Sequence, residues 1–126
     1  MDMGDLIAQM FLSREQAHRA HFKASGPGSY STHMALFEFY KAVVKKADSI
    51  AEKYQGEFLT QIDIPFLEPE EGDVYETILP VLKAHKDWIQ RYRYEACPES
   101  QTGIQNLIDD ALEIYKEVIY KLTFLK

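Results

Sequence analysis

The chain has 126 residues, of which 46% are hydrophobic and 27% are charged, and its formal net charge is −6. This composition and length predict one soluble globular domain over residues 1–126 with a single hydrophobic core. The negative charge and the lack of a basic arm predict that DNA binding is weak or absent. No apolar run approaches the roughly 20 residues that span a bilayer, so no membrane association is expected.

The cysteine content and the first residues bear on the cellular compartment. The only cysteine, Cys97, cannot form a disulfide within the chain. The acidic start of the sequence, "MDMGDL", lacks the basic region and apolar core of a signal peptide. Both features predict a cytoplasmic protein.

Apolar residues recur at helical spacing along four segments that Gly- and Pro-rich stretches separate. The predicted helices cover about residues 5–24, 31–54, 73–95 and 102–124. Phe11 is expected on the inner side of the first helix, Gly56 is expected to stop the second, and Pro80 is expected to kink the third or delay its start. Residues 57–72 contain two prolines and no sustained period, so they are interpreted as a connection with one short turn of helix at most. The fold class is therefore all-α: a four-helix bundle with a longer crossover connection between helices two and three.

Two of the four histidines, His21 and His33, flank a Gly-Pro-Gly turn between the first two predicted helices. A tight reversal there would let both imidazoles face a common point. Asp48 and Glu52 follow four residues apart, which places their carboxylates on one helical face, about 6 Å apart along the axis. His33 and Asp48 are separated by about 22 Å of helix rise, whereas metal–ligand bonds are only about 2 Å long. The four side chains therefore form one metal site across a symmetric dimer interface, or they form no four-ligand site.

The stretch from His21 to Lys53 resembles the Dps-like miniferritins, the DNA-binding proteins from starved cells, in the ferritin-like superfamily. That family has a histidine, a Gly-Pro turn and a second histidine twelve residues after the first. An aspartate follows fifteen residues later and a glutamate four residues after it, in an Asp-x-x-Ala-Glu-basic context. His21, His33, Asp48 and Glu52 match this spacing without a gap, and "DSIAEK" matches the context.

This resemblance implies a ferritin-like bundle and a site shared across a two-fold axis, where His21 and His33 of one chain face Asp48 and Glu52 of the other. These four residues are then both the metal ligands and the catalytic residues. The implied metal is iron, in a mono-iron or di-iron site, with zinc as a surrogate ion; histidine and carboxylate donors together suit iron. The implied activity is ferroxidase activity, the oxidation of Fe(II), with hydrogen peroxide as the expected oxidant. The implied assembly is a homo-oligomer, a dodecamer built from two-fold dimers, that stores ferric iron in its cage and protects against oxidative damage.

Two positions depart from the family pattern. Phe22 stands where a tryptophan usually follows the first histidine, and Phe37 stands where an acidic residue usually lies one turn after the second. Glu38 is adjacent, but it points about 100° away around the helix. The lysine-rich terminal arms of the family also have no counterpart. These differences keep an alternative open: a non-catalytic ferritin-like structural or binding protein with a degenerate metal site.

The other histidines and the aromatic residues are not expected to bind metal or to take part in catalysis. Glu15 and His18 resemble the Glu-x-x-His motif of larger ferritins, but the sequence has no second such pair, so an exposed His18 is expected. His85 is predicted to be structural or to lie on the surface. The tyrosines and phenylalanines are predicted to pack mostly in the core.

Overall fold

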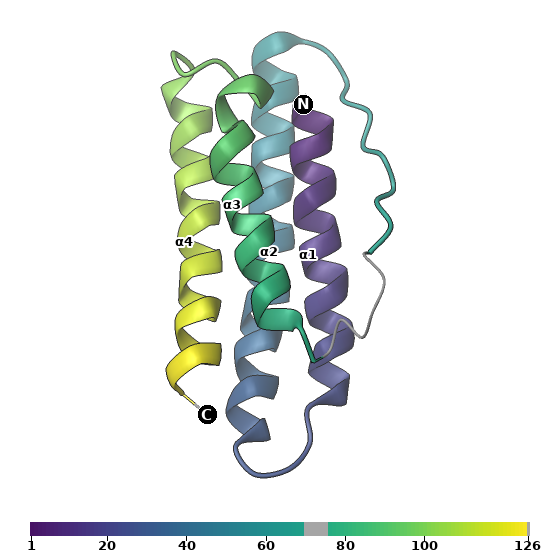
Figure 1. The fold of residues 1–126 in the computed structure, drawn as a ribbon. Coiled ribbons are helices and arrows are strands. Elements are labelled where there is room, and N and C mark those ends of the chain that lie inside the picture. Colours follow the sequence, from purple (N-terminus) through teal and green to yellow (C-terminus); the bar gives the residue numbers. More distant parts are fainter. Residues whose placement is uncertain (70–75, 126) are drawn as a thin grey trace.

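The computed structural model describes residues 1–69 and 76–125, which contain four α-helices (Figure 1). They are α1 (Met3–Lys23), α2 (Ser29–Phe58), α3 (Ile78–Ala96) and α4 (Thr102–Phe124). No β-strand occurs in these two ranges. The predicted all-α class is confirmed, and the fourth helix has the predicted bounds. Over the same ranges, no helix combines the length and the apolar composition needed to cross a membrane.

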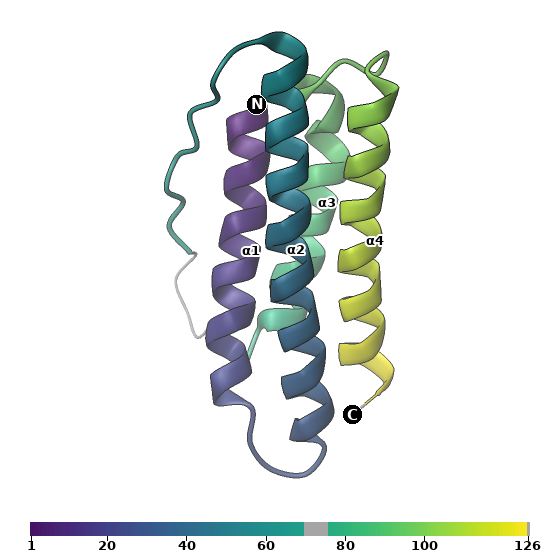
Figure 2. The same cartoon turned by 180° about the vertical axis from the view of Figure 1, so that it is seen from behind.

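The helices form a bundle in which each helix packs against two others. α1 and α4 each pack against both α2 and α3, which leaves α1–α4 and α2–α3 as the diagonal pairs. α1 and α2 are antiparallel, as are α3 and α4, whereas α2 and α3 run in the same direction (Figures 1 and 2). The described part of the α2–α3 connection runs down the outside of α1. The predicted four-helix bundle with one long crossover is therefore confirmed; ferritin-like folds share this topology.

The core consists of the apolar stripes that helical spacing predicts. Leu36 and Val43 of α2 and Ile108 of α4 are completely buried, and the Tyr115 ring meets the Phe39 ring edge-on at a centroid distance of 5.0 Å. The expectation that Phe11 points inward is wrong, because this side chain is 37% exposed. Phe11 lies about 100° around the helix from its buried neighbour Met10, at the flank of the apolar stripe.

Helix α2 continues beyond its predicted end. Gly56 was expected to stop the helix, but α2 passes through it and ends at Phe58, followed by Leu59 in the left-handed region with φ of 51°. A glycine costs a helix only about 1 kcal/mol, which is too little to end a long helix held by tertiary packing.

Helix α3 begins at Ile78, so Pro80 is its third residue. Proline is tolerated there because the N–H groups of the first turn have no partner within the helix. Pro80 thus marks the delayed start that the sequence suggested, and the predicted helical residues 73–75 lie outside the described part of the chain. Residues 60–69 contain no helical turn, so the short turn suggested for the connection is not found there.

The connection lies directly on α1, and Gly4 makes this approach feasible. Gly4 is buried, and a Cβ atom at this position would lie 1.8 Å from the carbonyl oxygen of Asp63. The Ile62 N–H donates a hydrogen bond to the Gln55 side chain (2.9 Å), which ties the connection to α2. Ile62 and Ile64 are half-buried against the core while Asp63 is exposed, so alternate residues of this segment face the bundle.

Candidate metal site

The two sequence-predicted histidines form a stacked pair at one end of the bundle. His21 lies in the last turn of α1, and His33 lies near the start of α2. Their ring centroids are 3.6 Å apart, and the ring planes are inclined by 24°. Nδ1 of His21 lies 2.9 Å from the carbonyl oxygen of His33, and Nδ1 of His33 lies 3.0 Å from the carbonyl oxygen of His21. A carbonyl oxygen can only accept, so both Nδ1 atoms are protonated and donate.

These reciprocal hydrogen bonds determine whether the second ring nitrogen, Nε2, carries a proton or a lone pair in the neutral imidazole. In a neutral imidazole with a proton on Nδ1, the Nε2 atom keeps its lone pair. Within the described chain, no residue hydrogen-bonds Nε2 of His21 or of His33. Histidines that bind metals generally donate their other ring N–H to a carbonyl or carboxylate, which orients the ring. Each ring therefore keeps an oriented lone pair on Nε2, within a pair in which His21 is buried and His33 is half-buried.

The turn sequence explains why these rings meet. Gly26 and Gly28 have positive φ values of 91° and 77°, which side chains other than glycine rarely tolerate. The Ser29 N–H closes the turn by donating to the Gly26 carbonyl oxygen at 3.1 Å. The Gly-Pro-Gly spacing thus reverses the chain tightly enough for one helix end to face the start of the next.

His18 lies close to the pair and corrects one expectation. It was predicted to be exposed, but it is half-buried. Its ring stacks on Tyr40 at a centroid distance of 4.2 Å and on Phe22 at 5.2 Å. The Tyr40 ring also meets His21 edge-on at 5.5 Å. His18 therefore belongs to the aromatic surroundings of the histidine pair.

Phe37 occupies the position where the family pattern has an acidic residue. Its ring lies 6.0 Å from the His21 ring, and the Nζ atom of Lys41 lies 4.7 Å from the centroid of Phe37. An apolar ring and a cation thus stand beside the histidines in place of a carboxylate. Position 37 of α2 therefore supplies no negative charge to the end of the bundle at which His21 and His33 lie.

Asp48 and Glu52 lie elsewhere on α2. Both are exposed, and neither forms an ion pair or a side-chain hydrogen bond with the residues described. Because α2 is one continuous helix, the rise from His33 to Asp48 is about 22 Å. The structure therefore brings His21 and His33 together but does not bring the carboxylates to them. Within residues 1–69 and 76–125, no three side chains of the ligand-forming types gather closely enough to hold a metal ion.

A second polar cluster lies inside the bundle, around Ser13. The Tyr115 hydroxyl donates to Ser13 Oγ (2.6 Å), Ser13 donates to the Gln9 carbonyl oxygen (3.0 Å), and Nδ1 of His85 lies 2.7 Å from Ser13 Oγ. Burial lowers the pKa of His85 from 6.5 to about 4, and burial also raises the pKa of Tyr115 above its usual range. A hydroxyl next to an imidazole resembles an activated nucleophile. Ser13 is completely buried, however, so substrate cannot reach it, and the cluster is structural.

His85 was predicted to be structural or on the surface, and its hydrogen bond makes it structural. Its partners were not identified from the sequence. Ser13 lies 72 residues from His85 along the chain, and Tyr115 lies 102 residues from Ser13. Contacts between residues so far apart leave no local spacing pattern in the sequence.

The described part of the chain is therefore an all-α bundle of four helices that holds two oriented imidazoles beside an aromatic cluster. The chain belongs to a protein family described as a family of unknown function (DUF5856), whose model matches residues 21–122. That range contains both histidines of the pair and both carboxylates. No curated protein and no solved structure matches the chain significantly.

Proposed function

We propose that this protein is a miniferritin-type iron-binding protein, with a site that forms where His21 and His33 of one copy meet Asp48 and Glu52 of a second. The observation that carries the proposal is the reciprocal hydrogen bonding of the two histidines, which leaves a lone pair on the Nε2 atom of each ring. Buried polar contacts of this kind orient metal-binding histidines in general.

The donor set fits a ferrous ion. Two neutral imidazole nitrogens and two carboxylates are the ligands that Fe(II) accepts readily, and the two negative charges balance the charge of the ion. Both carboxylates are exposed and unpaired within the described chain, so contact with a second copy breaks no ion pair of theirs. A two-fold axis makes two such sites at each interface, because each copy contributes its histidines to one site and its carboxylates to the other.

Fe(II) is the substrate of the proposed reaction, which is its oxidation to Fe(III). Each ferrous ion gives up one electron, and one hydrogen peroxide molecule takes electrons from two ferrous ions and, with two protons, becomes two water molecules. The carboxylates favour the product because a more highly charged ion gains more from negative ligands. The ferric product is stored in the cage of a cytoplasmic dodecamer. The reaction consumes peroxide, and together with storage it removes free Fe(II).

One observation favours a second candidate function, in which the site binds metal but does not oxidise it. Phe37 supplies no ligand, and the Lys41 cation lies over its ring. Nearby positive charge disfavours both the binding of a cation and its oxidation. In this alternative the protein is a ferritin-like structural or binding protein with a degenerate metal site.

Mixing two variants as subunits tests the shared site. His33→Ala removes a nitrogen donor and Asp48→Ala removes a charge, so each parent oligomer should lose most Fe(II) oxidation. Where a His33→Ala chain meets an Asp48→Ala chain, one of the two sites has all its ligands and the other lacks both groups. With random mixing of the two variants in equal amounts, the oligomers should contain roughly a quarter as many complete sites as the wild-type oligomer. Their activity should recover to about the same fraction. Co-assembly without any recovery would refute the shared site.

A metal-binding measurement distinguishes the two functions. Zinc titration of the mixed oligomers should recover roughly a quarter of the wild-type sites in either case. If zinc sites are recovered while the wild-type protein fails to oxidise Fe(II) with peroxide, the non-catalytic alternative holds.

A further inference from the structure

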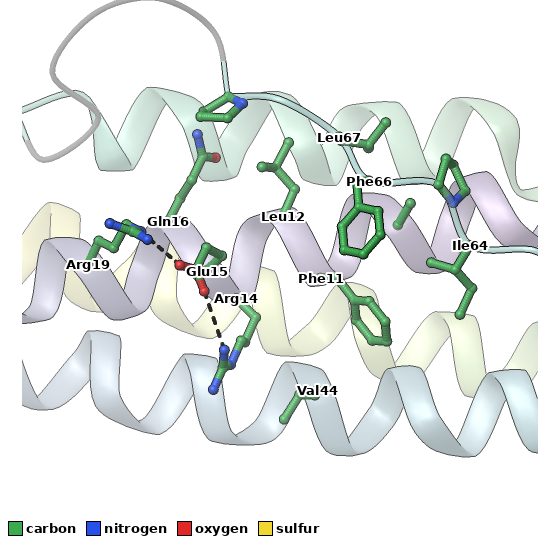
Figure 3. Close-up of a pocket in the computed structure, with 13 residues that line it drawn as sticks. Phe11, Leu12, Arg14, Glu15, Gln16, Arg19, Val44, Ile64, Phe66 and Leu67 are labelled. Carbon is green, nitrogen blue, oxygen red and sulfur yellow. Dashed lines mark hydrogen bonds and ion pairs between the residues drawn. The ribbon is translucent and has the colours of Figure 1, made fainter.

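A groove of about 750 Å³ lies along α1, between α2 and the connection that follows α2 (Figure 3). This volume falls within the range of roughly 300–1,000 Å³ that is typical of clefts for small organic ligands. The apolar side chains that line it are Phe11 and Leu12 of α1, Val44 of α2, and Ile64, Phe66 and Leu67 of the connection. The groove therefore suits the apolar part of a small molecule.

One end of the groove is polar and carries an excess of one positive charge. Arg14, Glu15 and Arg19 line this end, and the Glu15 carboxylate pairs with Arg14 at 3.4 Å and with Arg19 at 2.7 Å. One glutamate balances the charge of only one of the two arginines. The Arg14 and Arg19 side chains are 37% and 78% exposed, so a solute can approach both. Carboxylates pair especially well with guanidinium groups, because two parallel hydrogen bonds fit both partners.

Two polar atoms at this end have no hydrogen-bond partner in the described part of the chain. They are Nε of Arg14 and Oε1 of Gln16, and both atoms are buried. Gln16 is only 4% exposed, and it lies on the side of α1 that faces the connection, whereas Arg14 faces α2 (Figure 3). Buried polar atoms are hydrogen-bonded in the great majority of cases. Both atoms belong to flexible side chains, and a change of rotamer turns either side chain toward a polar group in the groove. An amide can also donate through its nitrogen, so Gln16 can serve an anionic head group.

The length of the groove sets the size of the ligand. The lining residues of α1 extend from Ala8 to Arg19, which corresponds to a helix rise of about 16 Å. An extended chain of about twelve carbons, with bonds of about 1.5 Å, spans about 14 Å. A head group at Arg19 therefore places the far end of such a chain beside Ala8.

We propose that this groove binds an amphipathic carboxylate, a molecule with one carboxylate head and an unbranched hydrocarbon chain of about twelve carbons. Arg14 and Arg19 hold the head, and the chain lies against Phe11 and Ile64. Phe66 is fully exposed, and Figure 3 shows it over the same groove as Phe11, so it gains an apolar contact from the hydrocarbon chain. None of these residues is one of the four proposed metal ligands, so the groove site does not depend on the proposed function.

Titration calorimetry with two probes of equal chain length tests the charge of the head group. Dodecanoate, used below the concentration at which it forms micelles, should bind the wild-type protein with one molecule per chain. Dodecyltrimethylammonium should bind at least about ten-fold more weakly, because its positive charge meets the two arginines. Equal or tighter binding of the ammonium probe would overturn the proposal.

Matched variants test the residues that hold the head. Arg14→Met removes the charge but keeps a long side chain, and it should weaken dodecanoate binding at least about ten-fold. Arg91→Met is the control, because it removes an equal charge from an exposed position of α3 outside the groove, and it should leave binding unchanged. Glu15→Gln frees both arginines and should strengthen binding several-fold. Equal affinities of Arg14→Met and Arg91→Met for dodecanoate would overturn the assignment of the head.

A second pair of variants tests the apolar part. Phe66→Ala should weaken dodecanoate binding several-fold, whereas Phe124→Ala should not, because Phe124 is 72% exposed near the end of α4 and does not line the groove. Circular dichroism should be the same for both variants and the wild type, because neither phenylalanine belongs to the core.

Failure of the wild-type protein to bind dodecanoate would also overturn the groove site. Sedimentation in the same buffer would then show whether a second copy covers the groove. A protein that binds dodecanoate but neither zinc nor Fe(II) would support the groove site and refute only the proposed function.

Discussion

His21 and His33 hold each other in place, since the Nδ1 atom of each ring donates to the carbonyl oxygen of the other residue at 2.9 and 3.0 Å. This exchange ties the end of α1 to the start of α2 through the same side chains that are proposed to bind metal. Removing either ring therefore does two things at once: it deletes a potential ligand and it frees the other ring.

Substitutions of His33 can separate these two effects. The side-chain amide of Asn places a donor close to where Nδ1 of histidine lies, so His33→Asn should keep the bond to the His21 carbonyl oxygen but supply no Nε2 atom. His33→Ala loses both. We expect both variants to lower zinc affinity at least about ten-fold, whereas only His33→Ala should also lower the thermal midpoint. His18→Ala, which removes a neighbouring imidazole outside the pair, is the control for zinc binding in an isothermal titration.

Acid should destabilise the protein through His85. Because burial lowers its pKa from 6.5 to about 4 in the folded state, the unfolded chain takes up the proton first as the pH falls. Stability should therefore be unaffected by this group above pH 6.5 and should fall between pH 6.5 and pH 4, by at most about 3 kcal/mol. His85→Gln has no group that titrates here, so its stability should fall less over the same range. The measurement is urea unfolding of both proteins at pH 7 and pH 4.5, and equal losses would contradict the assignment.

The close approach of the connection to α1 predicts opposite effects at two helical glycines. Gly4→Ala brings a Cβ atom onto the Asp63 carbonyl oxygen, so it should destabilise the fold by roughly 1–3 kcal/mol or detach the connection. Gly56→Ala meets no atom within 4 Å and should stabilise α2 by up to about 1 kcal/mol. Chemical unfolding measures both changes, and increased proteolysis of residues 59–69 in Gly4→Ala would reveal detachment. A neutral Gly4→Ala variant would contradict the close contact.

A buried arginine, Arg93, joins α3 to α4. Its contacts predict unequal losses of folding stability when one or the other of its two partners is replaced. Nε of Arg93 donates to Gln105 Oε1 (2.8 Å), and another guanidinium nitrogen pairs with Asp109 at 2.6 Å. Arg93 and Gln105 are both buried, whereas Asp109 is 57% exposed. Gln105→Leu leaves the buried Nε–H of Arg93 without an acceptor, although the guanidinium keeps its pair with Asp109, and should cost about 2–3 kcal/mol. Asp109→Asn should cost less than about 1 kcal/mol, and thermal unfolding that ranks the two variants in the opposite order would contradict this account.

Much of this molecule could be predicted from local patterns. The four helices follow from apolar residues at helical spacing, and the turn between His21 and His33 follows from glycines that alone adopt positive φ easily. The separation of His33 from the carboxylates also follows from sequence, because a helix has a fixed rise per residue. That separation already required a second chain for any site built from all four residues.

Only the tertiary structure decided the rest, because contacts between distant segments leave no periodic signal in one sequence. It showed that the histidine rings stack and exchange hydrogen bonds, which establishes their protonated nitrogens. In the folded chain Ser13 is buried and contacts His85 and Tyr115, so the Ser13 hydroxyl and the His85 imidazole cannot act on a substrate. The tertiary structure also laid the α2–α3 connection over Gly4, leaving Phe11 and Phe66 exposed at a groove. The helical pattern determines which residues share one face of a helix, but the packing of helices and connection determines which of those faces remain open to a partner.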